Sequence, residues 1–124
     1  MLNHVSVGVR DVAAARRFYD SVLGAIGATC LAHGDGYAGY GTDAPVWWLN
    51  ETAHPVSADM RSGLHFCFDA PSRHAVDAFH QAALRAGGKD NGKPGLRPDY
   101  GPDYYAAFAI DPDGHRIEAY HGGA

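Results

Sequence analysis

The sequence has few of the features that a nucleic-acid-binding or membrane protein needs. Among its 124 residues only 10 are lysine or arginine, against 14 aspartates and glutamates. The basic residues are scattered, so they form no stripe that could neutralise a phosphate backbone. No apolar run approaches the roughly 20 residues of a membrane-spanning helix, and the first residues do not have the pattern of a secretory signal. We therefore expect a cytoplasmic protein that contacts neither nucleic acid nor membrane.

Cysteine is equally scarce. Cys30 and Cys67 form no CxxC pair and lie in apolar, strand-like segments, so we predict buried free thiols rather than a disulfide or a structural zinc site. A chain of this length buries roughly two-thirds of its unfolded surface and can fold without a metal. Any metal that it binds is therefore expected to serve function rather than folding.

A strand and a helix are predicted near the start of the chain. From Asn3 to Arg10, valines alternate with His4, Ser6 and Gly8, which is the period of a half-buried strand. Asp11 then precedes a run of apolar residues at helical spacing, and Gly24 stands where that helix would end.

The same pattern returns in the second half of the sequence. In Leu64 to Asp69, His65 and Cys67 alternate with apolar residues, and Ser72 precedes a second helical stretch. Seven positions separate His4 from Asp11, and seven separate His65 from Ser72. The agreement indicates an internal repeat.

Short β-type runs follow each predicted helix. They are 28–32, 37–40 and 46–49 in the first half, and 104–110 and 115–120 in the second, after a Gly- and Pro-rich loop at 92–102. We predict an α+β fold in which two βαβββ modules form a cupped mixed β-sheet. The chain 1–124 would be a single domain, with repeat halves 1–50 and 63–124 joined by a linker at 51–62.

Three polar residues are predicted to share one metal ion. His4 and His65 lie on the strand faces opposite the apolar side chains, and Glu118 lies in the middle of the last strand. Burying a carboxylate there is costly unless a positive charge compensates it. Two imidazoles and one carboxylate also leave part of a metal's coordination sphere open for substrate. Singly, such histidines are more often structural, but equivalent placement in two matching halves favours a shared site.

At these residues the sequence resembles the vicinal-oxygen-chelate superfamily, which includes glyoxalase I, extradiol dioxygenases, fosfomycin-resistance proteins and bleomycin-binding proteins. The segments that carry the resemblance are His4-Val5-Ser6-Val7, Gly63-Leu64-His65-Phe66 and Asp111-Pro112-Asp113-Gly114-His115-Arg116-Ile117-Glu118. The resemblance implies metal ligands at His4, His65 and Glu118. It also implies a homodimer, with the metal bound either within one chain or between two.

One departure from the glyoxalase pattern stands at Trp48. Glyoxalase I has a fourth ligand in the last strand of its first half, and by the repeat this position is Trp48, which cannot replace a carboxylate. The resemblance therefore favours chemistry similar to that of the dioxygenases or thiol transferases over true glyoxalase chemistry. The predicted cofactor is one divalent ion of iron, manganese, nickel, cobalt or zinc.

The predicted function is a metal-dependent enzyme whose small substrate chelates the metal through vicinal oxygens. Tyr104 or Tyr105 could supply a hydrogen bond or a proton, although aromatic packing explains them equally well. The predicted substrate pocket contains Trp47, Trp48, Arg97 and Tyr120. The alternative is a non-catalytic drug- or metabolite-binding protein of the bleomycin-resistance type.

Overall fold

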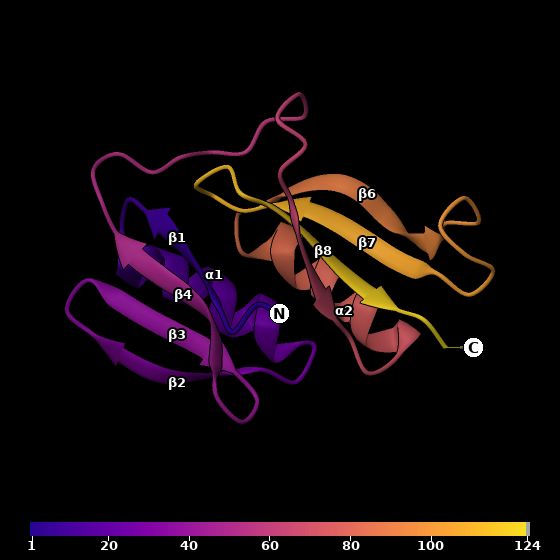
Figure 1. Cartoon of the computed structure of the whole chain (residues 1–124), viewed down its shortest axis with the longest axis horizontal. Helices are drawn as coiled ribbons and strands as arrows, with labels where there is room; N and C mark the ends of the chain where they lie inside the picture. The colour runs from indigo at the N-terminus through magenta and orange to yellow at the C-terminus, as the bar shows by residue number, and fades with distance from the viewer. Residues whose placement is uncertain (124) are drawn as a thin grey trace.

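The computed structural model describes residues 1–123 and contains two βαβββ modules (Figure 1). The first module consists of β1 (Val5–Val9), α1 (Val12–Gly24), β2 (Thr29–Gly34), β3 (Tyr37–Gly41) and β4 (Pro45–Glu51). The second consists of β5 (Phe66–Asp69), α2 (Arg73–Arg85), β6 (Lys89–Leu96), β7 (Tyr105–Ile110) and β8 (Arg116–His121). The predicted α+β fold with two modules is confirmed.

Each module has its own four-stranded mixed sheet. The strand orders are β1-β4-β3-β2 and β5-β8-β7-β6, so the two sheets have equivalent topologies. In each, the first strand pairs in parallel with the last, and the other pairings are antiparallel. Figure 1 shows the two sheets on opposite sides of the molecule, with the linker passing above them.

Both helices begin at the predicted residues. The side chain of Asp11 accepts a hydrogen bond from the Ala14 amide, and the Ser72 hydroxyl accepts one from the Ala75 amide. Each cap satisfies an amide that has no partner within its helix. The apolar stripes that follow pack into the core through residues that include Phe18 and Phe79.

The two sheets meet through the faces that their helices cover. Trp47, which is 2% exposed, packs its indole ring 5.0 Å from the ring of Phe66 and 5.1 Å from that of Phe68. These three side chains belong to the same core as the residues of α1 and α2. The other face of each sheet therefore points away from this core, and we call it the open face of that sheet.

A buried carboxylate at the turn between β7 and β8 ties the modules together. Asp111 is 4% exposed and accepts a 2.6 Å hydrogen bond from the hydroxyl of Tyr19 in α1. Its other oxygen accepts from the amides of Asp113 and His115. His115 also contacts the first module, because its Nε2 lies 2.7 Å from the carbonyl oxygen of Gly8.

Two expectations from the sequence were wrong. The Gly- and Pro-rich segment at 92–102 is not all loop, because β6 continues to Leu96 and pairs with β7 through two register shifts. Among the described residues both cysteines are free thiols, as predicted. They are not buried, however, because Cys67 is exposed and Cys30 is only partly buried. Cys67 lies on the open face rather than in the core.

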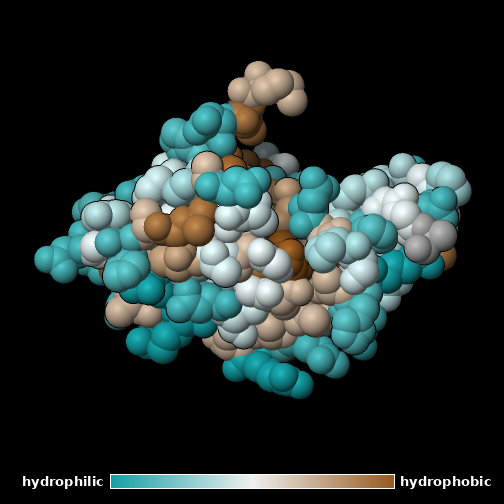
Figure 2. All heavy atoms as spheres, turned by 90° about the horizontal axis from the view of Figure 1, so that it is seen from below, coloured by the Kyte–Doolittle hydropathy of each residue, from teal (hydrophilic) through white to brown (hydrophobic). Residues whose placement is uncertain are grey.

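The surface of the described chain is mixed in character. Figure 2 shows apolar side chains in separate small areas near the middle of one face, with hydrophilic side chains around them. Neither of the helices in residues 1–123 is long and apolar enough to cross a membrane.

Candidate functional site

The candidate site is centred on Glu118, a carboxylate that is 2% exposed. Its Oε1 lies 2.9 Å from Nε2 of His65, and its Oε2 accepts a 2.6 Å hydrogen bond from the Tyr104 hydroxyl. The structure thus brings together three of the residues that the sequence singled out. Both oxygens of the buried carboxylate have a partner, which is what a buried charge requires.

Strand register places these groups on the open face of the second sheet. Glu118 pairs with Cys67 of β5 on one side and with Phe108 of β7 on the other. Its neighbours Ile117 and Ala119 point into the core. Because side chains alternate along a strand, Glu118 and Tyr120 share the open face, as the sequence predicted.

The repeat extends to the register of the strands. Ser6 of β1 pairs with Trp48 of β4, as Cys67 of β5 pairs with Glu118 of β8. Trp48 therefore occupies in the first module the place that Glu118 occupies in the second. The first sheet offers an indole where the second offers a carboxylate.

Cys67 is a member of the site that the sequence reasoning missed. Partial desolvation by the surrounding side chains, followed by the nearby Glu118 carboxylate, raises the pKa of its thiol to about 12. Burial and the hydrogen bond to Glu118 also raise the pKa of Tyr104. Both side chains are therefore protonated at neutral pH. The alternation in Leu64 to Asp69 already placed Cys67 on the same strand face as His65, so the sequence contained the information that Cys67 lies at the site.

An open hollow of about 570 Å³ lies in front of Glu118. Its walls combine acidic, imidazole and aromatic groups: His65, Asp99, Tyr100, Tyr104, Phe108 and Glu118. Tyr100 and Asp99 come from the loop after β6. The hollow is large enough for a small organic molecule.

His4 does not contact Glu118. Its Nδ1 lies 2.7 Å from the side-chain oxygen of Asn3 at an exposed position just before β1. His4 and His65 line a common hollow of about 670 Å³, but Glu118 does not belong to the lining of that hollow. Within residues 1–123, no three His, Cys, Asp or Glu side chains are arranged to hold a metal ion.

The two candidate tyrosines lie on opposite faces of the second sheet. Tyr104 faces Glu118, whereas the hydroxyl of Tyr105 donates a 2.6 Å hydrogen bond to Asp77 of α2. Tyr105 is also covered by the guanidinium of Arg73, 5.2 Å from its ring centroid. Of the pair, only Tyr104 is in a position to act at the candidate site.

The two tryptophans are separated in the same way. Trp47 lies in the core, while Trp48 lies on the open face of the first sheet with its ring centroid 6.4 Å from that of Tyr37. The Trp48 ring rests directly on the backbone, because a Cβ added at Gly39 would lie 2.6 Å from it. Of the two tryptophans, only Trp48 lies on a face of the first sheet where it could contact a ligand.

Tyr120 and Arg97 both lie near the candidate site. The ring of Tyr120 is 4.2 Å from that of Tyr104, so it supports the tyrosine that contacts Glu118. The guanidinium of Arg97 lies 5.4 Å from the ring centroid of Phe108.

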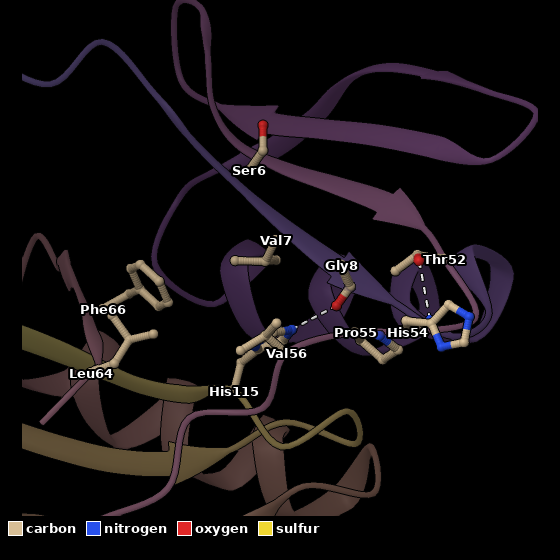
Figure 3. A pocket seen from close by; sticks show the side chains of 10 residues that line it. All are labelled: Ser6, Val7, Gly8, Thr52, His54, Pro55, Val56, Leu64, Phe66 and His115. Atoms are coloured by element: carbon tan, nitrogen blue, oxygen red, sulfur yellow. Dashed lines mark hydrogen bonds between the residues drawn. The ribbon is translucent and has the colours of Figure 1, made fainter. Parts of the chain in front are cut away.

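A separate hollow of about 300 Å³ lies between β1, the linker and the start of β5. Figure 3 shows Leu64 and Phe66 on one side of it and His54 and Pro55 on the other, with His115 bonded to Gly8 between them. Its only buried titratable side chain, His115, already has a partner. We assign this hollow to packing between the modules.

Comparison with known proteins identifies the family. A family model described as Glyoxalase/Bleomycin resistance protein/Dioxygenase superfamily matches residues 1–119. The chain belongs to this superfamily. A search of curated proteins gave no match.

Solved structures of this superfamily have the same fold. A glyoxalase/bleomycin resistance protein from Albidiferax ferrireducens T118 is 32% identical over 98% of each chain, with a TM-score of 0.85. A glyoxalase/bleomycin resistance protein/dioxygenase family enzyme from Burkholderia phytofirmans PsJN is 19% identical over 97% of each chain, with a TM-score of 0.73. The fosfomycin resistance protein FosX from Listeria monocytogenes is 15% identical and has a TM-score of 0.73, covering 99% of this chain and 93% of that chain. The last two similarities concern the fold alone.

Proposed function

We propose that this superfamily member is a metal-dependent enzyme whose small substrate chelates one divalent ion through vicinal oxygens. The observation that carries the proposal is the pairing of His65 with the buried Glu118. Nε2 of His65 lies 2.9 Å from Oε1 of Glu118, and both atoms could bind a metal. The pair lies in the wall of an open hollow. The indole at Trp48 favours dioxygenase- or transferase-like chemistry over the four-ligand chemistry of glyoxalase I.

The donor spacing fits a shared cation. Two ligands at about 2.1 Å from a metal, at right angles to each other, have donor atoms about 3 Å apart. His65 and Glu118 already have this spacing. Iron, manganese, nickel, cobalt and zinc all accept one imidazole and one carboxylate. When bound, the ion would act as a Lewis acid that stabilises negative charge on substrate oxygens.

The third ligand, His4, is proposed to come from a second copy of the chain. The open faces of the two sheets point away from their shared core, and the hollow that His4 shares with His65 does not include Glu118 in its lining. A symmetric dimer would place the first sheet of one copy opposite the second sheet of the other. Each of its two sites would then contain His4 from one copy and His65 with Glu118 from the other.

Tyr104 is proposed to orient the carboxylate. Its hydroxyl donates to Oε2 of Glu118, which leaves Oε1 toward His65. Because its pKa is raised, the phenol keeps its proton at neutral pH and maintains this hydrogen bond to Glu118.

Metal content in mixed dimers tests the proposal. His4→Ala and Glu118→Gln chains carrying different tags are coexpressed, and the mixed dimer is isolated through both tags. Each variant alone is expected to lose its metal. The mixed dimer regains one intact site of the two in the wild type, because one of its sites keeps both His4 and Glu118. Elemental analysis measures the bound metal.

Two results would contradict parts of this proposal. A mixed dimer without metal would show that His4 acts within its own chain. Undiminished metal in His4→Ala, His65→Ala and Glu118→Gln would dispose of the ligand set altogether.

A second candidate function is binding without catalysis. Trp48 and Tyr37 form an aromatic surface on the open face of the first sheet, which suits sequestration of a flat drug or metabolite. The two functions differ in metal content. Less than about a tenth of an equivalent after metal-replete purification would favour the binding protein.

A further inference from the structure

Arg97 is a cation held in place without an acidic partner. Its Nη2 donates a 2.7 Å hydrogen bond to the carbonyl oxygen of Lys93, and its guanidinium lies over the ring of Phe108. In the described part of the chain no salt bridge joins it to a carboxylate. Several of its N–H donors therefore remain available to a ligand.

Two glycines of β6 make room for this guanidinium. A Cβ added at Gly92 would lie 3.3 Å from Nη2 of Arg97, and one added at Gly95 would lie 3.3 Å from Nη1. The Arg97 side chain thus folds back over β6 and occupies the space where side chains of these residues would stand. Its position is set by contacts on both sides rather than by free rotation in solvent.

The register places Arg97 and Glu118 on the same face. Gly92 pairs with Phe108, and Phe108 pairs with Glu118. A row across β6, β7 and β8 therefore begins at the Arg97 guanidinium over Gly92, passes the Phe108 ring and ends at the Glu118 carboxylate. Two strand spacings amount to about 10 Å, and Phe108 between them also lines the hollow.

We propose that Arg97 determines specificity by binding an anionic group, such as a carboxylate, at the end of the substrate remote from its chelating oxygens. This inference rests on the proposed function, because it takes the chelating end to be held at His65 and Glu118. The substrate class would then be a short acid whose flat middle part lies along Phe108. A guanidinium suits this task because it can bind a carboxylate through two parallel hydrogen bonds.

A matched pair of probes tests the inference. The zinc-loaded protein is titrated with 3,4-dihydroxybenzoate and with 3,4-dihydroxybenzyl alcohol, which share the vicinal hydroxyls and the ring but differ in the carboxylate. Quenching of intrinsic fluorescence measures the two dissociation constants. The wild type is expected to bind the acid about tenfold more tightly than the alcohol, as one charge-assisted pair allows.

Variants assign the preference to Arg97. Arg97→Gln is expected to bring the two affinities to within about twofold of each other, and Arg97→Lys to retain part of the preference. Arg85→Gln is the control, because it removes an equal charge from an exposed position at the end of α2. It should keep the preference of the wild type. A residue that only supported β6 would change thermal stability but leave the ratio of affinities unchanged.

The zinc content of the same samples distinguishes a failure of the proposed role of Arg97 from a failure of the proposed function. If zinc is bound but the wild type shows no preference for the acid, or binds neither probe, the role of Arg97 is refuted and the metal site stands. An unchanged preference in Arg97→Gln refutes it equally. A wild type that holds no zinc or other divalent metal refutes the proposed function and this inference together.

Discussion

Replacement of Glu118 by glutamine is expected to abolish metal binding while leaving the metal-free protein at least as stable as the wild type. Without metal, the wild type buries a carboxylate whose two oxygens contact His65 and Tyr104. A neutral amide of the same shape removes the cost of burying that charge. The same change removes the anionic ligand, so the gain in stability and the loss of function have one cause.

Thermal unfolding with and without added metal measures both effects. A metal present at 100 times its dissociation constant stabilises the folded state by about 2.7 kcal/mol, which raises the Tm of a domain of this size by about 10 °C. We expect this increase in the wild type and in Asp43→Asn, a matched change in an exposed turn. We expect no increase in Glu118→Gln. An equal increase in all three proteins would remove Glu118 from the ligand set.

Replacement of Asp111 by alanine is expected to lower the free energy of unfolding by about 3 kcal/mol. The substitution removes three hydrogen bonds and leaves the buried hydroxyl of Tyr19 without a partner. It also releases the turn that ties β7 and β8 to the first module. Urea unfolding measures the loss.

Two further variants separate the contributions at Asp111. Tyr19→Phe removes one of the three hydrogen bonds and is expected to cost less than Asp111→Ala. In the double variant the two losses should not add, because the bond between Tyr19 and Asp111 can be removed only once. Additive losses would show that the two side chains act independently.

The same carboxyl predicts a dependence of stability on pH. Burial raises the pKa of Asp111 above its ordinary value, so the folded protein favours the protonated form. Its contribution to stability is therefore complete below the ordinary pKa of about 3.9 and is lost as pH rises through the folded value. Asp111→Asn should remove this dependence. Unfolding curves of both proteins across this pH range provide the comparison, and parallel profiles would argue against the raised pKa.

Much of the fold could be predicted from the sequence because local patterns specify it. Alternation in the strands and caps at Asp11 and Ser72 marked both modules correctly. The strand β6 was missed because its glycines and Pro94 are typical of loops. Pairing with β7 holds this segment extended, with bulges where the register shifts. Such pairing is a long-range interaction that local composition does not reveal.

The candidate site, like the fold, was predicted only in part from the sequence. Alternation along β5 and β8 was enough to place His65, Cys67 and Glu118 on one face, because side-chain direction in a strand depends only on position. The sequence alone could not separate Tyr104 from Tyr105, since both are aromatic residues at the start of one strand. Alternation predicts that these neighbours face opposite sides of the sheet, but only the structure shows that Tyr104 is the one that faces Glu118.

What the sequence determined by itself was the repeat, and with it the two modules and the strand face shared by His65, Cys67 and Glu118. The tertiary structure decided how the modules pack: their helix-covered faces meet, so the open faces with His4 and Glu118 point away from a common core. It also placed Arg97 over Gly92 and beside Phe108. These outcomes depend on contacts between segments distant in the chain, and periodicity carries no information about which faces of two modules come together.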